Sequence, residues 1–126
     1  MAGDIVILDG ARTAIGTFGG SLAAIPPIEL AAAAIREALA RSGVEAGQIG
    51  QVVFGHVIDT EPRDMYLSRA AAIEAGVPDT TPAMNVNRLC GSGRRRSCRV
   101  CRRSLSATPT SRLRAGRRAC RARPTC

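Results

Sequence analysis

Short apolar runs alternate with amphipathic stretches along the first three quarters of the chain, and this alternation is the strongest constraint on its fold. The apolar runs 4–9, 51–58 and 82–89 have the length and composition of strands that are buried on both faces of a sheet. Residues 28–42 and 65–75 lie between them and place apolar side chains at helical spacing. The order β-α-β-α-β predicts an α/β fold with a mainly parallel sheet.

Proline and glycine mark the ends of both predicted helices. Pro26 and Pro27 open the first helix, where a missing backbone N–H costs no helical hydrogen bond. Gly43 closes that helix, and Gly76 followed by Pro78 closes the second. The polar segment 59–64, DTEPRD, precedes the second helix, and we interpret it as a solvated loop.

Charge divides the chain into a body and a tail. Residues 1–93 contain all 10 acidic residues and six arginines, whereas residues 94–126 contain 12 arginines and no acidic residue. The body therefore carries a net charge of 6 − 10 = −4 and the tail +12, so the positive charge of the chain belongs to the tail, which we expect to be a disordered basic segment. A basic tail suits nucleic acid, but no aromatic residue lies among these arginines to stack on bases. We therefore keep nucleic-acid binding as the alternative function only.

The N-terminal residues and the hydropathy of the chain indicate where in the cell the protein is expected. The first residues, MAGDIVILDG, lack the basic start and small-residue cleavage site of a secretory signal. No stretch approaches the ~20 apolar residues of a membrane span. With one cysteine in the body, we expect a cytoplasmic protein that does not enter the membrane.

Cys90 is the candidate catalytic residue. It follows the apolar run 82–89 and precedes Gly-Ser-Gly, so we expect it at the carboxyl end of a strand and the N-terminus of a helix. The helix dipole there favours the thiolate, and small neighbours leave room for a carbonyl group and for N–H donors to an oxyanion. A buried structural cysteine fits the same pattern. The residues alone leave both interpretations open.

His56 is the only histidine, and it is a candidate base for Cys90. Nothing in the spacing links the two residues. We interpret His56 as a strand residue with a local hydrogen bond.

The tail cysteines suggest a zinc site only in part. One pair has the C-x-x-C spacing, but a structural zinc site needs four ligands, the other pair is spaced differently, and the tail has no histidine. We expect no metal site at Cys98, Cys101, Cys120 and Cys126.

Three segments together resemble the N-terminal part of the thiolases. They are GARTAIGTFGGSL, VVFGHVIDTEPRDMYLSRAAAIEAGVP and NVNRLCGSG, and they are most similar to bacterial β-ketothiolases of the acetyl-CoA acetyltransferase type. The resemblance runs nearly without a gap over residues 4–93. Several motifs in the right order make it more specific than any single pattern.

The resemblance implies that Cys90 is the acyl-accepting nucleophile of an acyltransferase. The family performs Claisen condensation of acyl-CoA, or thiolysis of 3-ketoacyl-CoA in reverse, through an acyl-cysteine. It implies coenzyme A thioesters as substrates, no further cofactor, a role in fatty acid metabolism and a homo-oligomer. No family role transfers to His56. The family's catalytic histidine and second cysteine lie in later segments, so we predict that the 126-residue chain is inactive. We also expect its body to be poorly folded, because three strands and two helices lack the layers that would cover them.

The resemblance is predicted to stop at Gly93. The family continues into a buried helix of small residues, similar to Ala-Gln-Ala-Ile-Val-Ser, where this chain has Arg94-Arg95-Arg96. Burying unpaired guanidinium groups costs several kcal/mol each. Codons can be chosen for residues 94–98 and 106–126 so that one shifted frame reads as thiolase sequence in both. We therefore predict a truncated thiolase N-terminal domain over 1–93 and an out-of-frame Arg/Cys-rich tail over 94–126.

Overall fold

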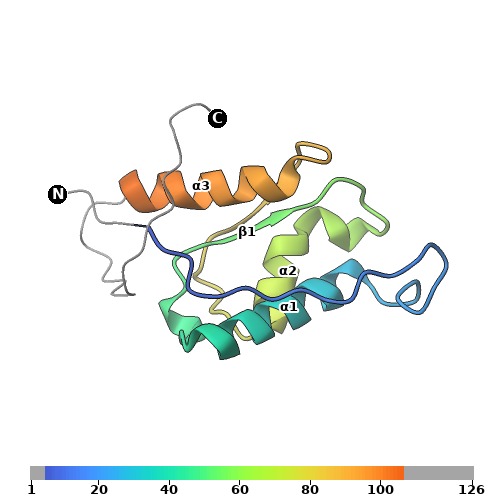
Figure 1. Ribbon diagram of the computed structural model, residues 1–126, viewed down its shortest axis with the longest axis horizontal. Helices are drawn as coiled ribbons and strands as arrows, with labels where there is room; N and C mark the ends of the chain where they lie inside the picture. The colour runs from blue at the N-terminus through green and yellow to red at the C-terminus, as the bar shows by residue number, and fades with distance from the viewer. Residues whose placement is uncertain (1–4, 107–126) are drawn as a thin grey trace.

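The computed structural model describes the backbone of residues 5–106 and side chains as far as residue 102 (Figure 1). Three α-helices, two short 3-10 helices and two strands make up this part of the chain. In order they are α1 (Pro27–Ser42), η1 (Ala46–Gln48), β1 (Val52–Gly55), η2 (Pro62–Tyr66), α2 (Leu67–Glu74), β2 (Ala83–Val86) and α3 (Ser92–Ser106).

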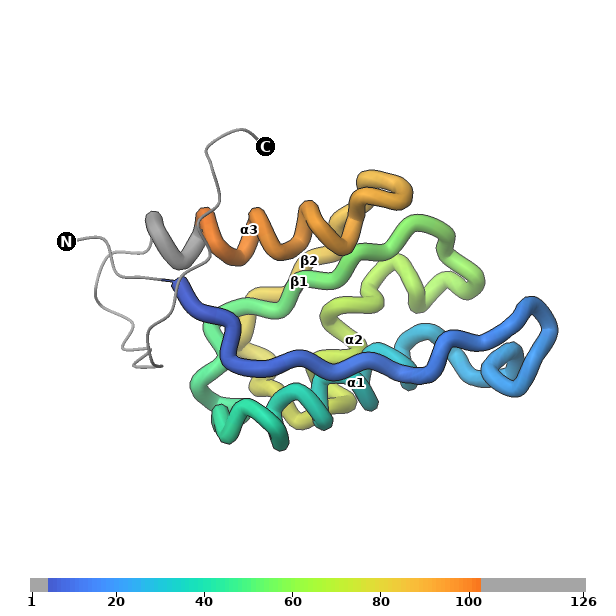
Figure 2. The backbone as a smooth tube through the Cα atoms, viewed as in Figure 1, coloured from blue at the N-terminus to red at the C-terminus, as the bar shows by residue number. Residues whose placement is uncertain are grey.

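The two strands form a parallel sheet that lies between helices. Val52 pairs with Ala83 and Gly55 pairs with Val86. Helix α3 covers one face of the sheet, and α2 covers the other with α1 packed beyond it (Figures 1 and 2). The α/β class and the parallel pairing predicted from the sequence are therefore confirmed.

Small side chains fill the interface between α1 and α2. Ala32 and Ala71 are fully buried, so the two helices approach closely without a large side chain between them. Two clusters make up the core. Their buried members are Ile28, Ala31, Ala32, Leu67 and Ala71 in one, and Val52, Ala72 and Val77 in the other.

The helix boundaries follow the predicted signals. Pro27 is the first residue of α1, and Gly43 ends it with φ +65° while its N–H donates to the Leu39 carbonyl at 3.0 Å. Gly76 follows α2 with φ +84°. Glycine adopts this left-handed conformation without the Cβ clash that other residues meet.

The predicted first strand at 4–9 is not formed. Within the described residues the sheet has two strands, and residues 5–9 have no assigned secondary structure. Ile7 is 80 % exposed. The apolar pattern is present, but a strand also needs a neighbour for its backbone groups, and none of the described strands pairs with this segment. The order observed is therefore α-β-α-β-α.

The structure also departs from the expectation of a disordered tail. Residues 94–106 continue α3 as helix, and residues 107–126 lie outside the described residues. Arginine is a good helix former, and no glycine or proline interrupts this stretch. Most of its described arginines are exposed, so the helix avoids the burial cost that argued against it.

None of the helices within residues 5–106 is long and apolar enough to cross a membrane.

Candidate active site

A tight turn connects β2 to α3 and carries Cys90 at its tip. The Gly91 N–H donates to the Arg88 carbonyl at 2.9 Å, and the Ser92 N–H donates to the Leu89 carbonyl at 3.0 Å. Leu89 has φ +45°, a left-handed conformation that a bulky residue rarely adopts. This turn leaves Cys90 exposed and unbridged, two residues before the first residue of α3.

The buried side chain of Ser92 stabilises the turn through two hydrogen bonds to its backbone. Its side chain is almost fully buried, and its Oγ accepts a hydrogen bond from the Arg88 N–H at 2.9 Å and donates one to the Leu89 carbonyl at 2.7 Å. Gly55 at the end of β1 lies directly beneath it. A Cβ on Gly55 would come within 2.7 Å of the Ser92 Cβ, so only glycine lets the strand approach the turn this closely.

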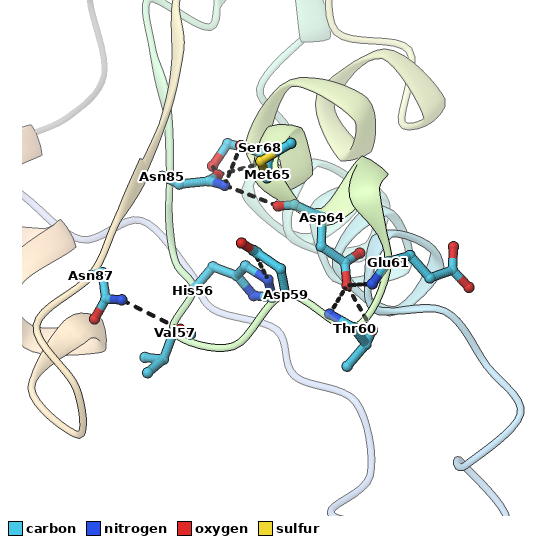
Figure 3. Close-up of polar contacts among 10 residues, drawn as sticks. All are labelled: His56, Val57, Asp59, Thr60, Glu61, Asp64, Met65, Ser68, Asn85 and Asn87. Atoms are coloured by element: carbon cyan, nitrogen blue, oxygen red, sulfur yellow. Dashed lines mark hydrogen bonds and ion pairs between the residues drawn. The ribbon is translucent and has the colours of Figure 1, made fainter.

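Asn87 connects the turn to the segment after β1. Its Oδ1 accepts a hydrogen bond from the Leu89 N–H at 3.1 Å, and its Nδ2 donates to the Val57 carbonyl at 3.3 Å (Figure 3). The carboxyl ends of both parallel strands therefore hold the Cys90 turn. Ligands and reacting groups gather at this edge of parallel sheets.

His56 follows β1, and its ring lies beside Asp59. Its backbone N–H extends the sheet by donating to the Val86 carbonyl at 3.1 Å. Its Nε2 lies 3.0 Å from Asp59 Oδ1, although the angle does not make a hydrogen bond, and the ring is only 14 % exposed (Figure 3). The interpretation of His56 as a strand residue with a local hydrogen bond therefore needs correction. His56 lies directly after β1, and its Nε2 lies near Asp59 without a hydrogen bond.

The segment 59–64 is not simply a solvated loop, because Asp64 is 1 % exposed. Its Oδ2 accepts hydrogen bonds from the Thr60 hydroxyl at 2.6 Å, the Thr60 N–H at 2.8 Å and the Glu61 N–H at 3.1 Å (Figure 3). The Thr60 hydroxyl lowers the pKa of Asp64 most, and the two N–H groups add to this against the opposing effect of burial. The carboxylate therefore stays ionised.

Sequence reasoning missed this role of Asp64, although a signal was present. Asp64 is the third residue after Glu61, with Pro62 at the first helical position of η2. An acidic residue three positions after the N-cap is the pattern of a side chain that bonds back to the N-cap backbone.

A second polar network ties α2 to both strands. The Ser68 hydroxyl accepts a hydrogen bond from the Phe54 N–H at 3.2 Å and lies 2.8 Å from the Met84 carbonyl that it can donate to. Asn85 Nδ2 donates to the carbonyls of Asp64 at 3.2 Å and Met65 at 3.0 Å (Figure 3). The strand ends and the loop before α2 are thus held as one unit beneath the turn.

No group of three or more potential metal ligands gathers within the described part of the chain. Cys98 and Cys101 are unbridged and half-buried on α3. Cys120 and Cys126 lie outside the described residues.

The fold and the turn define a class of protein: an α/β domain that presents an exposed cysteine between a parallel strand and a helix. The family model of the thiolase N-terminal domain matches residues 5–103. The chain belongs to the thiolase family. The match extends ten residues beyond Gly93, where the resemblance was predicted to stop.

Relatives and solved structures agree with this assignment. The chain is 59 % identical over 93 residues to Beta-ketothiolase BktB of Cupriavidus necator, which covers 74 % of this chain and 24 % of that protein. It is 50 % identical over 90 residues to an acetyl-CoA acetyltransferase of the same organism, covering 71 % of this chain and 23 % of that protein.

Among solved structures, it matches the acetyl-CoA acetyltransferase of Bacillus anthracis with a TM-score of 0.74 and 35 % identity, covering 82 % of this chain and 25 % of that one. It also matches the structure of human mitochondrial 3-ketoacyl-CoA thiolase in complex with CoA, with a TM-score of 0.72 and 32 % identity. That match covers 75 % of this chain and 24 % of the human one. The chain therefore spans about a quarter of the length of these relatives.

Proposed function

We propose that this chain is the nucleophile-bearing part of a thiolase-type acyltransferase, with Cys90 as the acyl acceptor. The observation that carries the proposal is the exposed thiol in the turn between β2 and α3. Hydrogen bonds from Ser92 and Asn87 hold that turn, so the thiol has a defined place at the sheet edge.

The proposed reaction has two steps. The Cys90 thiolate attacks the carbonyl carbon of an acyl-CoA thioester, and the coenzyme A thiolate leaves, so the acyl group remains on sulfur. The α-carbanion of a second acyl-CoA then attacks the acyl carbon, which forms the carbon–carbon bond and releases the Cys90 thiolate. Thiolysis of a 3-ketoacyl-CoA is the reverse sequence.

The turn limits which groups can stabilise the oxyanion of each step. The amides of Gly91 and Ser92 are already bonded to carbonyls within the turn. They are therefore not free to serve as the N–H donors that the sequence suggested, and other amides must supply that stabilisation.

The wider assignment rests on the family alone. We propose acyl-CoA substrates, no additional cofactor, a homo-oligomer, and a cytoplasmic role in fatty acid metabolism. The names of the relatives support acyl-CoA chemistry, since they include acetyltransferases of acetyl-CoA and a 3-ketoacyl-CoA thiolase. The nucleic-acid alternative has no support among these comparisons.

The 126-residue chain is proposed to be inactive by itself. It spans about a quarter of its relatives, and the resemblance places the second cysteine and the catalytic histidine in later segments. Purified chain should show no thiolysis of acetoacetyl-CoA, and sustained turnover would refute this part of the proposal.

Acylation of the thiol tests the role of Cys90 separately. Incubation with acetyl-CoA followed by peptide mass spectrometry should show an acetyl adduct on Cys90 before Cys98 or Cys101. A Cys90→Ser variant should lose this adduct, and a Cys98→Ser variant should retain it. Equal acetylation of all three cysteines would contradict the nucleophile assignment.

We also propose that the arginine-rich segment from residue 94 arises from a shifted reading frame. The composition change at Gly93 and the thiolase-like text that a shifted frame permits support this proposal. Resequencing the DNA around the Gly93 codon tests it, because a genuine tail would show no single-base gain or loss relative to close relatives.

A further inference from the structure

A pocket of about 340 Å³ lies between β2 and α3, beside the Cys90 turn. Residues 84–88 form one side, and Arg95 and Arg99 of α3 form the other. We call this the arginine pocket. It exists in the polypeptide as it stands, whatever the origin of the codons for its arginines.

Two of the three arginines of the pocket, Arg95 and Arg99, lie in a row on α3, and Arg88 lies in the turn before that helix. Arg95 and Arg99 are four residues apart and therefore share one helix face, about 6 Å apart at Cβ. Gly91 occupies the next position of the same row and has no side chain. The Arg88 Nη1 fills that place, because it lies 3.4 Å from where a Cβ on Gly91 would stand. The Arg88 guanidinium thus extends the row of Arg95 and Arg99 beyond the N-terminus of α3.

No carboxylate neutralises this row within the described residues. The ion pairs there join Arg41 to Glu37, His56 to Asp59 and Arg63 to Glu74. The other residues that line the pocket are Met84, Asn85, Val86 and Asn87, none of which is acidic. Like charges on neighbouring helical turns repel one another, so a bound anion would relieve this repulsion.

The amide nitrogens of the two asparagines that line the pocket already donate hydrogen bonds to backbone carbonyls. Asn85 Nδ2 donates to the carbonyls of Asp64 and Met65, and Asn87 Nδ2 donates to the Val57 carbonyl. Recognition in the pocket therefore falls to the arginines. Guanidinium groups bind phosphate oxygens in pairs of parallel hydrogen bonds.

We propose that the arginine pocket binds a diphosphate group, held by Arg88, Arg95 and Arg99. A diphosphate carries several negative charges and oxygens along one axis, which fits a row of three guanidiniums better than a single carboxylate does. The pocket volume is at the small end of ligand sites, so it suits one end of a larger molecule or a small free anion. This inference does not depend on acyl transfer by Cys90.

Titration calorimetry of the purified 126-residue chain with inorganic pyrophosphate at low ionic strength tests the proposal. Arg95→Gln and Arg99→Gln should each weaken binding about tenfold or more, as expected for loss of a charge-assisted contact. Arg94→Gln is the matched control, because Arg94 is exposed on the same helix and does not line the pocket. It should change the affinity about twofold or less.

A second titration, with desulfo-CoA, distinguishes the two sources of a diphosphate. Tighter binding than pyrophosphate, lost in Arg95→Gln, would assign the pocket to the nucleotide end of a coenzyme A thioester. Equal or weaker binding would assign it to a free diphosphate. Circular dichroism of each variant confirms that the helices remain.

Two results would overturn the proposal. One is the absence of pyrophosphate binding at millimolar concentration. The other is equal weakening by Arg94→Gln and Arg95→Gln, which would show a diffuse charge effect.

Discussion

Asp64 is a buried carboxylate whose single oxygen Oδ2 accepts three hydrogen bonds. Those bonds fix the loop between β1 and α2 from within, since two of the donors are backbone N–H groups of Thr60 and Glu61. A neutral carboxyl group accepts such bonds less strongly than an ionised one. The loop is therefore sensitive to acid at this residue.

The lowered pKa of Asp64 predicts a loss of stability in acid. Its ordinary value in an unfolded chain is about 3.9, so its contribution to the unfolding free energy is full above that pH and disappears as pH falls through the lower folded value. Asp64→Asn should remove this component. Urea unfolding between about pH 6 and pH 3 measures it, with Asp79→Asn, at an exposed site, as the control. An unchanged acid dependence in Asp64→Asn would contradict the prediction.

Gly55 is the residue on which the approach of β1 to the Cys90 turn depends. A Cβ there would lie 2.7 Å from Ser92 Cβ and 2.9 Å from its carbonyl carbon, and backbone cannot move aside as a flexible side chain can. We predict that Gly55→Ala lowers the unfolding free energy by about 1–3 kcal/mol. Gly47→Ala is the control, because a Cβ there meets nothing within 4 Å. Equal denaturation midpoints for the two variants would contradict the prediction, because they would show that the turn can move away from β1 without a loss of stability.

At the scale of elements, α2 is the helix that joins the layers. It packs on α1 through buried alanines and on both strands through Ser68. Helix α1 adds one hydrogen bond, from Arg36 Nη1 to the Glu74 carbonyl at 2.9 Å, whereas α2 also satisfies a backbone donor of β1 through Ser68. The register of the two strands relative to α2 is therefore specified by polar contacts as well as by packing.

Ser68→Ala tests that link. The substitution leaves the Phe54 N–H without its hydroxyl acceptor in a part-buried site, and a buried donor without a partner costs about 1–3 kcal/mol. We expect the unfolding free energy to fall by that amount in chemical denaturation. Ser21→Ala, at an exposed turn residue, should change it by less than about 0.5 kcal/mol. If the Ser68→Ala variant were as stable as the parent, the hydroxyl would make no net contribution to the free energy of unfolding.

Helix α3 is held on the sheet differently from α2, because neither core cluster contains a residue of α3. Arg96 lies over the Phe54 ring with its guanidinium carbon 5.8 Å from the ring centroid. A cation–π contact at an exposed site contributes about 0.5–1 kcal/mol. The buried Ser92 and this contact hold the N-terminal turns of α3 on β1.

At the scale of the whole molecule, the chain leaves many large apolar side chains in contact with solvent. They are Ile7, Leu8, Ile15, Phe18, Val57, Ile58, Met65, Tyr66, Ile73, Leu89 and Val100. Four of them lie in the segment before α1, and two of these, Ile7 and Leu8, lie in residues 5–9, which form no strand. The chain spans about a quarter of its relatives, which is consistent with a surface that other segments cover in a longer protein.

This exposed surface predicts self-association of the 126-residue chain. Replacing Ile7, Ile15 and Phe18 with serine should lower binding of an apolar dye and reduce the aggregate fraction in size-exclusion chromatography, without loss of helical circular dichroism. Replacing the exposed Ala14, Ala23 and Ala24 with serine is the matched control. Equal effects of both triple variants would point to an association surface elsewhere.

The sequence was sufficient for much of this fold. Helices α1 and α2, both strands and the place of Cys90 before α3 were all predicted, because they depend on local periodicity, on proline and glycine at helix ends, and on a short turn between neighbouring elements. The motif NRLCGSG placed Cys90 at a strand end, but the residues alone left open whether its thiol is reactive or buried, and the structure shows it exposed.

Contacts between distant residues decided the rest. Residues 5–9 have the apolar pattern of a strand but form none, because pairing depends on neighbours that the pattern does not reveal. Asp64 carries a charge that suggests solvent, yet donors at Thr60 and Glu61 make its burial favourable. The arginine row appears only when Arg88 folds over Gly91 beside α3. Local sequence thus determines where the helices begin and end, whereas tertiary contacts determine which apolar segments pair as strands and which polar groups become buried.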